Sequence, residues 1–314
     1  MKKHLPSAAI LLSALLVLCM YAFTSDRDHA GSGSSLPAAY HLGYLFSPIQ
    51  GASYADFIQV VQPIRPSLVS VNLRTDPEFI VDGFSIGRET PRTMTNNTVY
   101  VAVTPFLRIL FPDVQPSLEN DIFRASGTGM EFVGRDLSGY FRVNGRYFYV
   151  PAGNILQGGD FLVPLYTLSE ALGCTVFQQD PQTYVIRRVG PAASAKTYNE
   201  EDLYWLSRII YAEAGNQIMA GRVAVGTVIL NRVANEHFPN TIKEVIFAPR
   251  QFSPVSNGMI YRDPDFDSTV AAMLCLDGVR EAGDSLYFNT SRLNSWANKT
   301  KTYVATIGDH KFYM

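Results

Sequence analysis

The clearest alternation of apolar and polar positions in the C-terminal third of the chain begins at Leu203. Leu203, Leu206 and Ile210 follow one another at spacings of three and four residues, which predicts an amphipathic helix with one buried face. Glu213 lies on the same face, because it follows Ile210 by three residues. Gly215 stands where we expect this helix to end in a left-handed cap.

Glu213 therefore occupies an unfavourable position for a charged carboxylate. It lies among apolar neighbours in the last helical turn, beside the negative end of the helix dipole, and both effects raise its pKa. A carboxyl group that is still protonated near neutral pH can serve as a general acid. The sequence leaves an alternative open, in which Glu213 is solvated or forms an ion pair with Arg208 or Arg222.

The segment that follows, residues 223–233, is apolar nearly all round. This pattern predicts a helix that is buried on all sides. A partly polar helix that ends on a glutamate and packs against a fully buried helix resembles the core of a lysozyme-like domain.

An internal repeat precedes this region. Residues 79–83 recur as residues 141–145, and residues 99–110 recur as residues 161–172, both 62 residues later. Two separate matches at one offset indicate a duplicated unit. Each copy predicts a hairpin with an Asp-Gly or Asn-Gly turn, then a strand, then a short helix. Two more predicted strands close the second copy: residues 174–177 and 183–186.

The second copy carries three short motifs: Asn144-Gly145, Val163-Pro164-Leu165 and Leu172-Gly173. With them the repeat resembles the small domain first named from the N-terminus of copper amine oxidases, which recurs on exported bacterial wall proteins. The first copy departs from that pattern, with Asp82 in place of the Asn and a longer return. The resemblance implies a binding or spacer module. Because no histidine and only one cysteine lie between His41 and His237, no copper site of the ordinary type can be built there.

The N-terminus has the pattern of an export segment. Lys2 and Lys3 precede an uncharged apolar run over residues 5–23, which predicts a signal peptide. The run also approaches the length that spans a bilayer, so a cleaved signal and an uncleaved membrane anchor both remain open. We therefore expect an exported protein in the cell wall or on the outer face of the membrane.

These patterns predict an α+β chain. A mainly β N-terminal domain of two repeats, made of strands and short helices, is followed by a mainly α, lysozyme-like C-terminal domain. Stretches that contain Pro, Gly and Ser separate the parts, as is typical of linkers. The expected organisation is residues 1–30 signal peptide or anchor, 31–66 linker or extended segment, 67–189 repeat domain (copies at about 79–140 and 141–189), 190–199 linker, and 200–314 C-terminal domain.

Composition limits the range of partners. The formal net charge is −2 with 17% charged residues, so no basic surface for nucleic acid is indicated. The aromatic content of 12% suits either sugar stacking or β-rich cores. Cys174 and Cys275 lie in apolar runs and are predicted to be small core residues, with an interdomain disulfide as the alternative; Cys19 lies in the export segment. No metal or cofactor is predicted.

Six motifs follow one another after residue 200: Ile210-Tyr211-Ala212-Glu213-Ala214, residues 221–233, residues 238–247, Gln251-Phe252-Ser253, Ser285-Leu286-Tyr287-Phe288 and Ile307-Gly308-Asp309-His310-Lys311-Phe312. In this order they resemble the SleB-type cell wall hydrolases, the spore cortex-lytic family. Asp309 stands where that family usually has Asn, and Ser285 where it usually has Ala.

The resemblance implies a lysozyme-like fold and cleavage of the glycan strand of peptidoglycan, with Glu213 as the general acid. A lytic transglycosylase can use one carboxyl group as acid and then as base, whereas a hydrolase usually needs a second carboxylate. The acids available in sequence are Asp263, Asp265 and Asp267, whose pattern is more typical of a turn and a helix start. We therefore favour the non-hydrolytic route.

Six further residues are candidates for binding the sugar: Gln251, Phe252, Ser253, Tyr287, Trp296 and His310. The first three form a loop that can reach sugar hydroxyls. Tyr287 and Phe288 alternate along a predicted strand, so one is expected to face the cleft and the other the core. Trp296 lies in a polar loop, where a sugar platform and a buried role are both open. His310 either bonds in the cleft or holds the C-terminal strand.

Two other functions remain as alternatives. An N-acetylmuramoyl-L-alanine amidase or wall peptidase would need Cys275 activated by His237 or His310, or a zinc site from histidines that lack the usual spacing. A non-catalytic wall-binding protein would keep the fold without the chemistry. The sequence leaves open whether the peptidoglycan partner is the vegetative wall or the spore cortex.

Overall fold

A computed structural model of the chain describes residues 77–290 and 296–314, which belong to one compact unit. The predicted export segment with Cys19 and the predicted linker over residues 31–66 lie outside the described residues. Among the residues that are described, no helix combines the length and the apolar character that a membrane span requires. Helices and strands are mixed along the chain, so the α+β class is confirmed.

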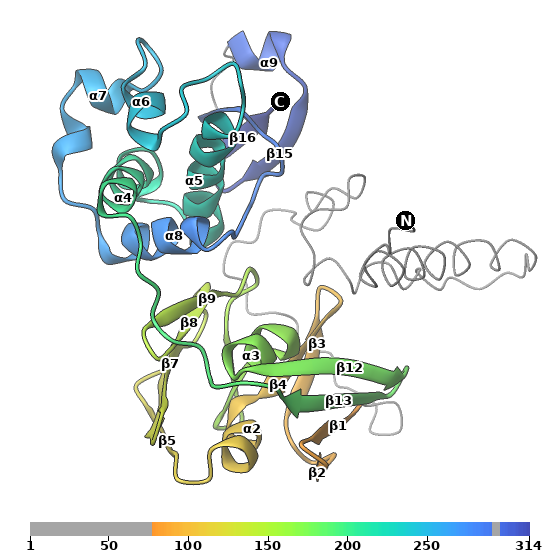
Figure 1. Cartoon of the computed structure of the whole chain (residues 1–314). Helices are drawn as coiled ribbons and strands as arrows, with labels where there is room; N and C mark the ends of the chain where they lie inside the picture. The colour runs from red at the N-terminus through yellow and green to blue at the C-terminus, as the bar shows by residue number, and fades with distance from the viewer. Residues whose placement is uncertain (1–76, 291–295) are drawn as a thin grey trace, which may run out of the picture. The chain divides into compact units, whose positions relative to one another are not determined.

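Residues 78–188 form a region of strands and short helices (Figure 1). Its first half contains β1 (Glu78–Val81), β2 (Phe84–Ile86), β3 (Arg92–Thr95), β4 (Thr98–Ala102) and α2 (Val103–Leu110). Its second half contains β8 (Tyr140–Val143), β9 (Arg146–Tyr149), β10 (Ile155–Gln157), β11 (Asp160–Pro164), α3 (Leu165–Ala171), β12 (Cys174–Asp180) and β13 (Thr183–Arg188). The order hairpin, hairpin, helix thus occurs in both halves, and α3 begins 62 residues after α2.

Two features of this region differ from the sequence prediction. β3 and β10 give each half a second hairpin, where we predicted a single strand before the helix. The first half is longer after its helix α2, and this extra segment forms the strands β5 (Gln115–Glu119), β6 (Ile122–Gly127) and β7 (Met130–Arg135). These strands continue into β8 and β9 as one antiparallel sheet with the order β5–β6–β7–β8–β9.

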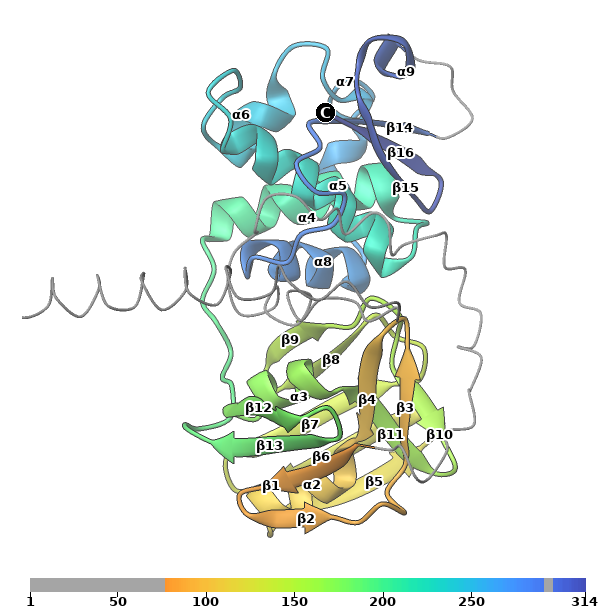
Figure 2. The same ribbon diagram turned by 90° about the vertical axis from the view of Figure 1, so that its right-hand side faces the viewer.

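Strands of the two halves pair with each other. β1 runs parallel to β13, with Phe79 opposite Tyr184, and β4 runs antiparallel to β11, with Val101 opposite Val163. The corresponding sheets have the orders β12–β13–β1–β2 and β10–β11–β4–β3 (Figure 2). The halves also share one hydrophobic core with stacked and edge-on rings: Phe123, Phe132, Phe141, Phe148 and Phe161.

The predicted hairpin turns have the expected backbone geometry. Asp82 and Gly83 have φ of 47° and 87°, and Asn144 and Gly145 have φ of 46° and 83°. Two successive positive φ angles are those of a type I′ turn, which suits the twist of a two-residue hairpin. Both turn predictions are therefore confirmed.

The C-terminal region consists of helices followed by a small sheet. Its elements are α4 (Glu200–Ala214), α5 (Met219–Val233), α6 (Ile242–Phe247), α7 (Ser253–Ser256), η3 (Met259–Tyr261), α8 (Phe266–Leu276), β14 (Tyr287–Thr290), α9 (Trp296–Thr300), β15 (Tyr303–Ile307) and β16 (His310–Tyr313). The strand order of the sheet is β14–β16–β15. Asn199 caps α4 by accepting a hydrogen bond from the backbone N–H of Asp202, so the helix predicted from Leu203, Leu206 and Ile210 begins at Glu200.

α5 packs closely against α4 and α8, as its apolar sequence predicts. A Cβ atom on Gly226 would lie 2.6 Å from Sγ of Cys275 on α8 and 2.9 Å from Cδ1 of Ile210 on α4. Val223, Val225 and Ile229 belong to the core that these helices share. The packing of α5 and α8 against α4 fixes the end of α4, where Glu213 is located.

The prediction of a left-handed cap at Gly215 is wrong. Gly215 has φ −60° and ψ −21°, which is right-handed. Its lack of a side chain matters for another reason, because a Cβ there would lie 2.6 Å from the carbonyl oxygen of Tyr211 and 2.9 Å from its ring. Glycine is needed at the end of α4 for close packing rather than for a positive φ.

Candidate functional site

Glu213 is half-buried in the last turn of α4. Burial raises the pKa of its carboxyl group to about 7. Among residues 77–290 and 296–314, no hydrogen bond or ion pair to the Glu213 carboxyl is found. The group is therefore protonated for much of the time at neutral pH and has no described partner to hold its proton.

The alternative of an ion pair at Glu213 is not what the structure contains. The Nη2 atom of Arg208 lies 2.6 Å from Oδ1 of Asp263. The Nη1 atom of Arg222 lies 2.5 Å from Oδ1 of Asp265. Both arginines thus bond to aspartates.

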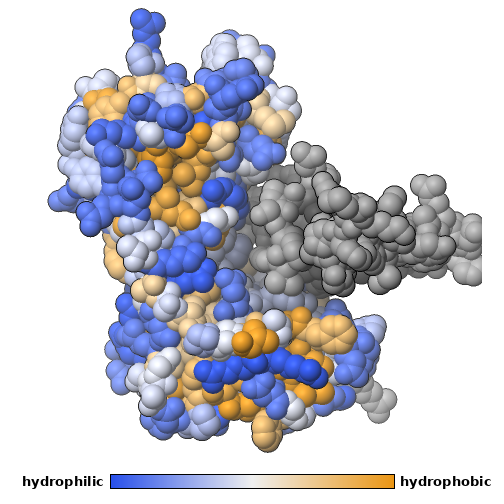
Figure 3. All heavy atoms as spheres, viewed as in Figure 1, coloured by the Kyte–Doolittle hydropathy of each residue, from blue (hydrophilic) through white to orange (hydrophobic). Residues whose placement is uncertain are grey.

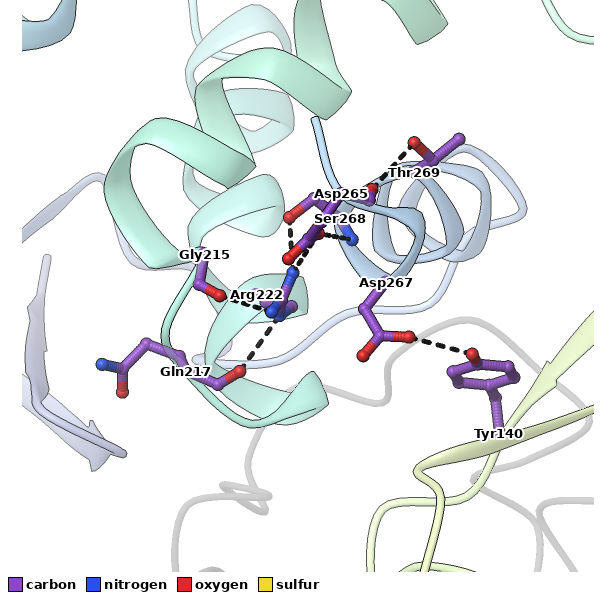
Figure 4. A network of polar contacts seen from close by, with 8 residues as sticks. All are labelled: Tyr140, Gly215, Gln217, Arg222, Asp265, Asp267, Ser268 and Thr269. Carbon is purple, nitrogen blue, oxygen red and sulfur yellow. Dashed lines mark hydrogen bonds and ion pairs between the residues drawn. The ribbon is translucent and has the colours of Figure 1, made fainter. Parts of the chain in front are cut away.

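Asp263, Asp265 and Asp267 have structural roles of the kind that their sequence pattern favoured. Asp265 caps α8, because its Oδ1 accepts a hydrogen bond of 2.8 Å from the backbone N–H of Ser268. Asp267, in the first turn of α8, accepts a hydrogen bond of 2.9 Å from the hydroxyl of Tyr140 (Figure 4). Burial is the cause of the raised pKa of Glu213, with no contribution from another described carboxylate.

Arg232 contacts two residues of the predicted sugar-binding loop, Gln251 and Phe252. The guanidinium of Arg232 donates from Nη1 to Oε1 of Gln251 (3.1 Å) and from Nε to the carbonyl of Leu286 (2.7 Å). It also lies 5.1 Å from the ring centre of Phe252 and 5.5 Å from that of Tyr287. Arg232 was not predicted as a site residue, although a charged residue in an otherwise apolar helix was a visible signal.

The three loop residues differ in exposure. Gln251 and Ser253 are exposed, whereas Phe252 is buried and packs against Phe288, with 6.3 Å between the ring centres. A buried ring cannot stack on a sugar. Phe252 therefore supports the loop from below, and Gln251 and Ser253 are the residues that solvent reaches.

Tyr287 and Trp296 form an aromatic pair with a lysine beside it. The two rings meet edge to face at 5.8 Å. The Nζ atom of Lys301 lies 4.5 Å from the Tyr287 ring centre and 5.2 Å from that of Trp296. Trp296 is 60% exposed, so it is not a core residue, and its ring is open to a ligand. Lys301 was not predicted.

Phe288 and His310 lie on the core side of the small sheet. Phe288 contacts Phe312 and His310 at ring distances of 5.9 Å and 5.5 Å. His310 is 4% exposed, and burial lowers its pKa, so it is neutral at pH 7. Among the described residues, its Nδ1 atom has no hydrogen-bond partner. These contacts support the role of His310 in holding the C-terminal strand.

The cysteine and metal alternatives gain no support from the described residues. Cys174 and Cys275 are buried and free, as predicted for small core residues. Burial raises the pKa of the Cys275 thiol to about 12, which disfavours the thiolate that a nucleophile needs. Residues 77–290 and 296–314 contain no group of three His, Cys, Asp or Glu side chains arranged to hold a metal ion.

Glu281 is a second glutamate with a raised pKa, and sequence reasoning missed it. It is 2% exposed, and burial raises its pKa to about 7. The hydroxyl of Tyr149 donates a hydrogen bond of 2.8 Å to its Oε1. Because the side chain is enclosed, a polymer cannot reach it. Of these two glutamates, Glu213 is the one that combines a raised pKa with access to solvent.

Figure 3 shows an apolar area on the face of the C-terminal region that carries α4 and α5, with hydrophilic surface on both sides of it. An apolar area bordered by polar groups is typical of a surface that binds a ligand. Sugar rings have apolar faces and polar edges, so such a surface matches them in kind.

Comparisons with known proteins find relatives of the C-terminal region. Residues 216–313 match the family described as Cell Wall Hydrolase. A spore cortex-lytic enzyme of Bacillus cereus is 36% identical over 116 residues, which are 37% of this chain and 45% of that protein. The corresponding enzyme of Oceanobacillus iheyensis is 34% identical over 116 residues, 42% of its length. The catalytic domain of the germination-specific lytic transglycosylase SleB from Bacillus anthracis is 33% identical, covering 38% of this chain and 98% of that domain, with a TM-score of 0.36.

The C-terminal region of the chain is a cell wall hydrolase domain. More particularly, it is of the SleB type, as the order of the six motifs predicted. The chain spans less than half the length of the curated relatives that it matches. The family match begins at residue 216, just after Glu213, and does not include it.

Proposed function

We propose that this protein cleaves the glycan strand of peptidoglycan and that Glu213 is its general acid. The observation that carries the proposal is the state of the Glu213 carboxyl group: half-buried, with its pKa raised to about 7 by burial and without a described bonding partner. A general acid works best when its pKa lies near the working pH. The relatives named as spore cortex-lytic enzymes support peptidoglycan as the substrate.

In the proposed reaction, Glu213 gives its proton to the oxygen that links C1 of N-acetylmuramic acid to the next N-acetylglucosamine. The bond between C1 and that oxygen breaks, and the N-acetylglucosamine leaves as an alcohol. The Glu213 carboxylate then takes the proton of the muramic C6 hydroxyl, and O6 forms a bond to C1. The products are a 1,6-anhydro end and a restored, protonated Glu213.

We favour this lytic transglycosylase route over hydrolysis, because one carboxyl group suffices for it. A hydrolase would need a second carboxylate near the same bond. Asp263, Asp265 and Asp267 bond instead to Arg208, Arg222 and Tyr140. The raised pKa of Glu213 has burial as its cause, with no contribution from a neighbouring carboxylate.

We propose that Gln251, Ser253, Tyr287 and Trp296 contact the sugar chain. Gln251 and Ser253 offer exposed polar groups, and Trp296 offers an exposed ring beside Tyr287. Phe252 and His310 support this surface from the core, as their burial indicates. The domain would keep a lysozyme-like arrangement, in which the acid lies at the end of one helix and the sugar contacts lie on loops and strands around it.

The rest of the chain fits export to the wall. We propose that residues 67–189 are the copper amine oxidase N-terminal-like repeat domain, acting as a binding or spacer module without copper. Residues 1–30 would direct export, leaving the protein in the wall or on the outer face of the membrane. The names of the relatives favour spore cortex peptidoglycan over the vegetative wall as its target.

The test compares the full chain with its Glu213→Gln variant on purified peptidoglycan and identifies the released muropeptides by mass spectrometry. Anhydro-muramic ends that disappear in the variant are the expected result. Reducing sugar ends that disappear would keep Glu213 as the acid and replace the transglycosylase route by hydrolysis. Free stem peptides with an intact glycan strand would refute the proposal in favour of an amidase or peptidase.

A further inference from the structure

Arg222 is a buried arginine in the first turns of α5, with an exposure of 6%. Its guanidinium donates from Nη2 to the carbonyl of Gly215 (2.5 Å) and from Nε to the carbonyl of Gln217 (3.0 Å). From Nη1 it donates to Oδ1 of Asp265 (2.5 Å) and Oγ of Ser268 (2.6 Å). Figure 4 shows the side chain pointing into the turn between α4 and α5, with the N-terminus of α8 beside it.

The bonds of Arg222 end on the segment that directly follows Glu213. Gly215 is the C-cap of α4, and its carbonyl belongs to the helix end, where carbonyls lack partners within the helix. A positively charged donor is a favourable partner at this end of a helix. By bonding to Gly215 and Gln217 together, Arg222 fixes the path of the chain just beyond the proposed acid.

A second contact fixes the same turn from another side. The Oε1 atom of Gln217 accepts a hydrogen bond of 2.9 Å from the backbone N–H of Asp309, and its Nε2 atom donates to Oδ2 of Asp309 (3.2 Å). Asp309 lies in the turn between β15 and β16. The turn after Glu213 is thus tied to α8 through Arg222 and to the small sheet through Gln217.

The guanidinium of Arg222 joins the ends of two helices. Asp265 already caps α8 through the backbone N–H of Ser268 (2.8 Å), and the same oxygen also accepts the bond from Arg222. One carboxylate therefore joins the start of α8 to the end of α4. A planar guanidinium with several donors can hold such an arrangement in one geometry, which a lysine ammonium cannot do.

We infer that Arg222 is a positioning residue for glycan cleavage: it holds the turn Gly215–Gln217 and thereby sets where the Glu213 carboxyl group points. This inference rests on the proposed function of Glu213. A general acid has to lie within hydrogen-bond distance of the oxygen that it protonates. A displacement of about 1 Å can lower the rate of a reaction about a hundredfold, so the support of Glu213 affects turnover as well as folding.

The experiment compares Arg222→Met, Arg222→Lys and Arg208→Met in the full-chain protein. Arg208 is a matched control, because it lies on the same helix as Glu213 and bonds to Asp263, yet makes no described contact with the turn after Glu213. The kcat and KM of each variant are measured on soluble glycan strands, well below its thermal unfolding midpoint. Circular dichroism shows whether each variant is folded.

The expected result for Arg222→Met is a fall in kcat of roughly tenfold to a hundredfold with little change in KM. Arg222→Lys restores part of that loss, and Arg208→Met keeps the kcat of the unchanged protein even if its midpoint falls. Equal kcat values for the folded Arg222 and Arg208 variants would overturn the inference. If Arg222→Met does not fold, Arg222→Lys together with Gln217→Ala decides, and unchanged kcat in both would likewise overturn it.

A Glu213→Gln variant in the same assay separates this inference from the proposed function. Loss of activity in Glu213→Gln with full activity in the Arg222 variants removes the positioning role alone. Full activity in Glu213→Gln removes the proposed function, and the positioning role with it.

Discussion

Replacing Glu213 by Gln should remove activity and stabilise the protein at neutral and alkaline pH. Glutamine has nearly the shape of the protonated acid and carries no charge. Burial raises the pKa of Glu213 from 4.5 to about 7 in the folded state, so the folded protein pays for the charged form, whereas the unfolded chain does not. The substitution removes that penalty.

The size and the sign of the effect follow from the two pKa values. The difference is about 2.5 units, which at 1.36 kcal/mol per unit corresponds to about 3 kcal/mol of unfolding free energy. Because the folded pKa is the higher one, the stabilising contribution is complete below pH 4.5 and is lost as the pH rises to about 7. The variant should match the unchanged protein near pH 4 and exceed its stability by about 3 kcal/mol at pH 8.

Urea unfolding of both proteins at pH values between 4 and 8 measures this difference directly. Glu281 also has a pKa raised to about 7, but it is present in both proteins, so its contribution cancels. Over the same range, the activity of the unchanged protein should fall as the pH rises through about 7, because the acid loses its proton. A stability difference that stays constant between pH 4 and pH 8 would refute the account of Glu213 as a buried acid.

Three further changes test other parts of the site. Trp296→Ala should raise the KM for glycan strands roughly twofold to tenfold by loss of ring stacking. Its unfolding midpoint should not change, because Trp296 is 60% exposed. A lower midpoint would contradict a role of Trp296 on the surface. Gly215→Ala should destabilise the protein by about 1–3 kcal/mol in urea unfolding, because the new Cβ would meet the carbonyl of Tyr211 at 2.6 Å, and unchanged stability would disprove this packing. Cys275→Ala should keep full activity, and so should the unchanged protein after treatment with a thiol-blocking reagent, because the Cys275 thiol is buried with a pKa of about 12. Loss of activity in the variant would favour the alternative of a cysteine amidase or peptidase.

Local sequence patterns were sufficient to predict the elements that carry the proposed acid. The spacing of Leu203, Leu206 and Ile210 placed Glu213 on the partly buried face of α4, and its pKa is raised as that position required. Asp-Gly and Asn-Gly dipeptides specified the hairpin turns of the strand region. Each of these features depends on residues within one or two helical turns or one hairpin.

Features that depend on distant residues could not be predicted in the same way. Arg222 bonds to Asp265 and Ser268, and nothing near Arg222 in sequence indicates which of several acids becomes its partner. Lys301 lies 4.5 Å from the ring centre of Tyr287, a contact that joins the segment after α9 to β14 and that no short-range pattern indicates. The conformation of Gly215, by contrast, was mispredicted for a local reason: the close approach of the Tyr211 carbonyl and ring, not backbone handedness, determines the need for glycine there.

The pairing of β1 with β13 also bears on how the chain acquires its structure. Glu78 of β1 has Thr183 of β13 as its partner, so the first strand of the region has no neighbour on that side until nearly the whole region has been synthesised. Contacts between residues so far apart in sequence close large loops, and proteins dominated by them fold slowly. For a chain that is exported as we propose, the sheet that contains β1 and β13 would therefore be completed late, after most of the region has been made.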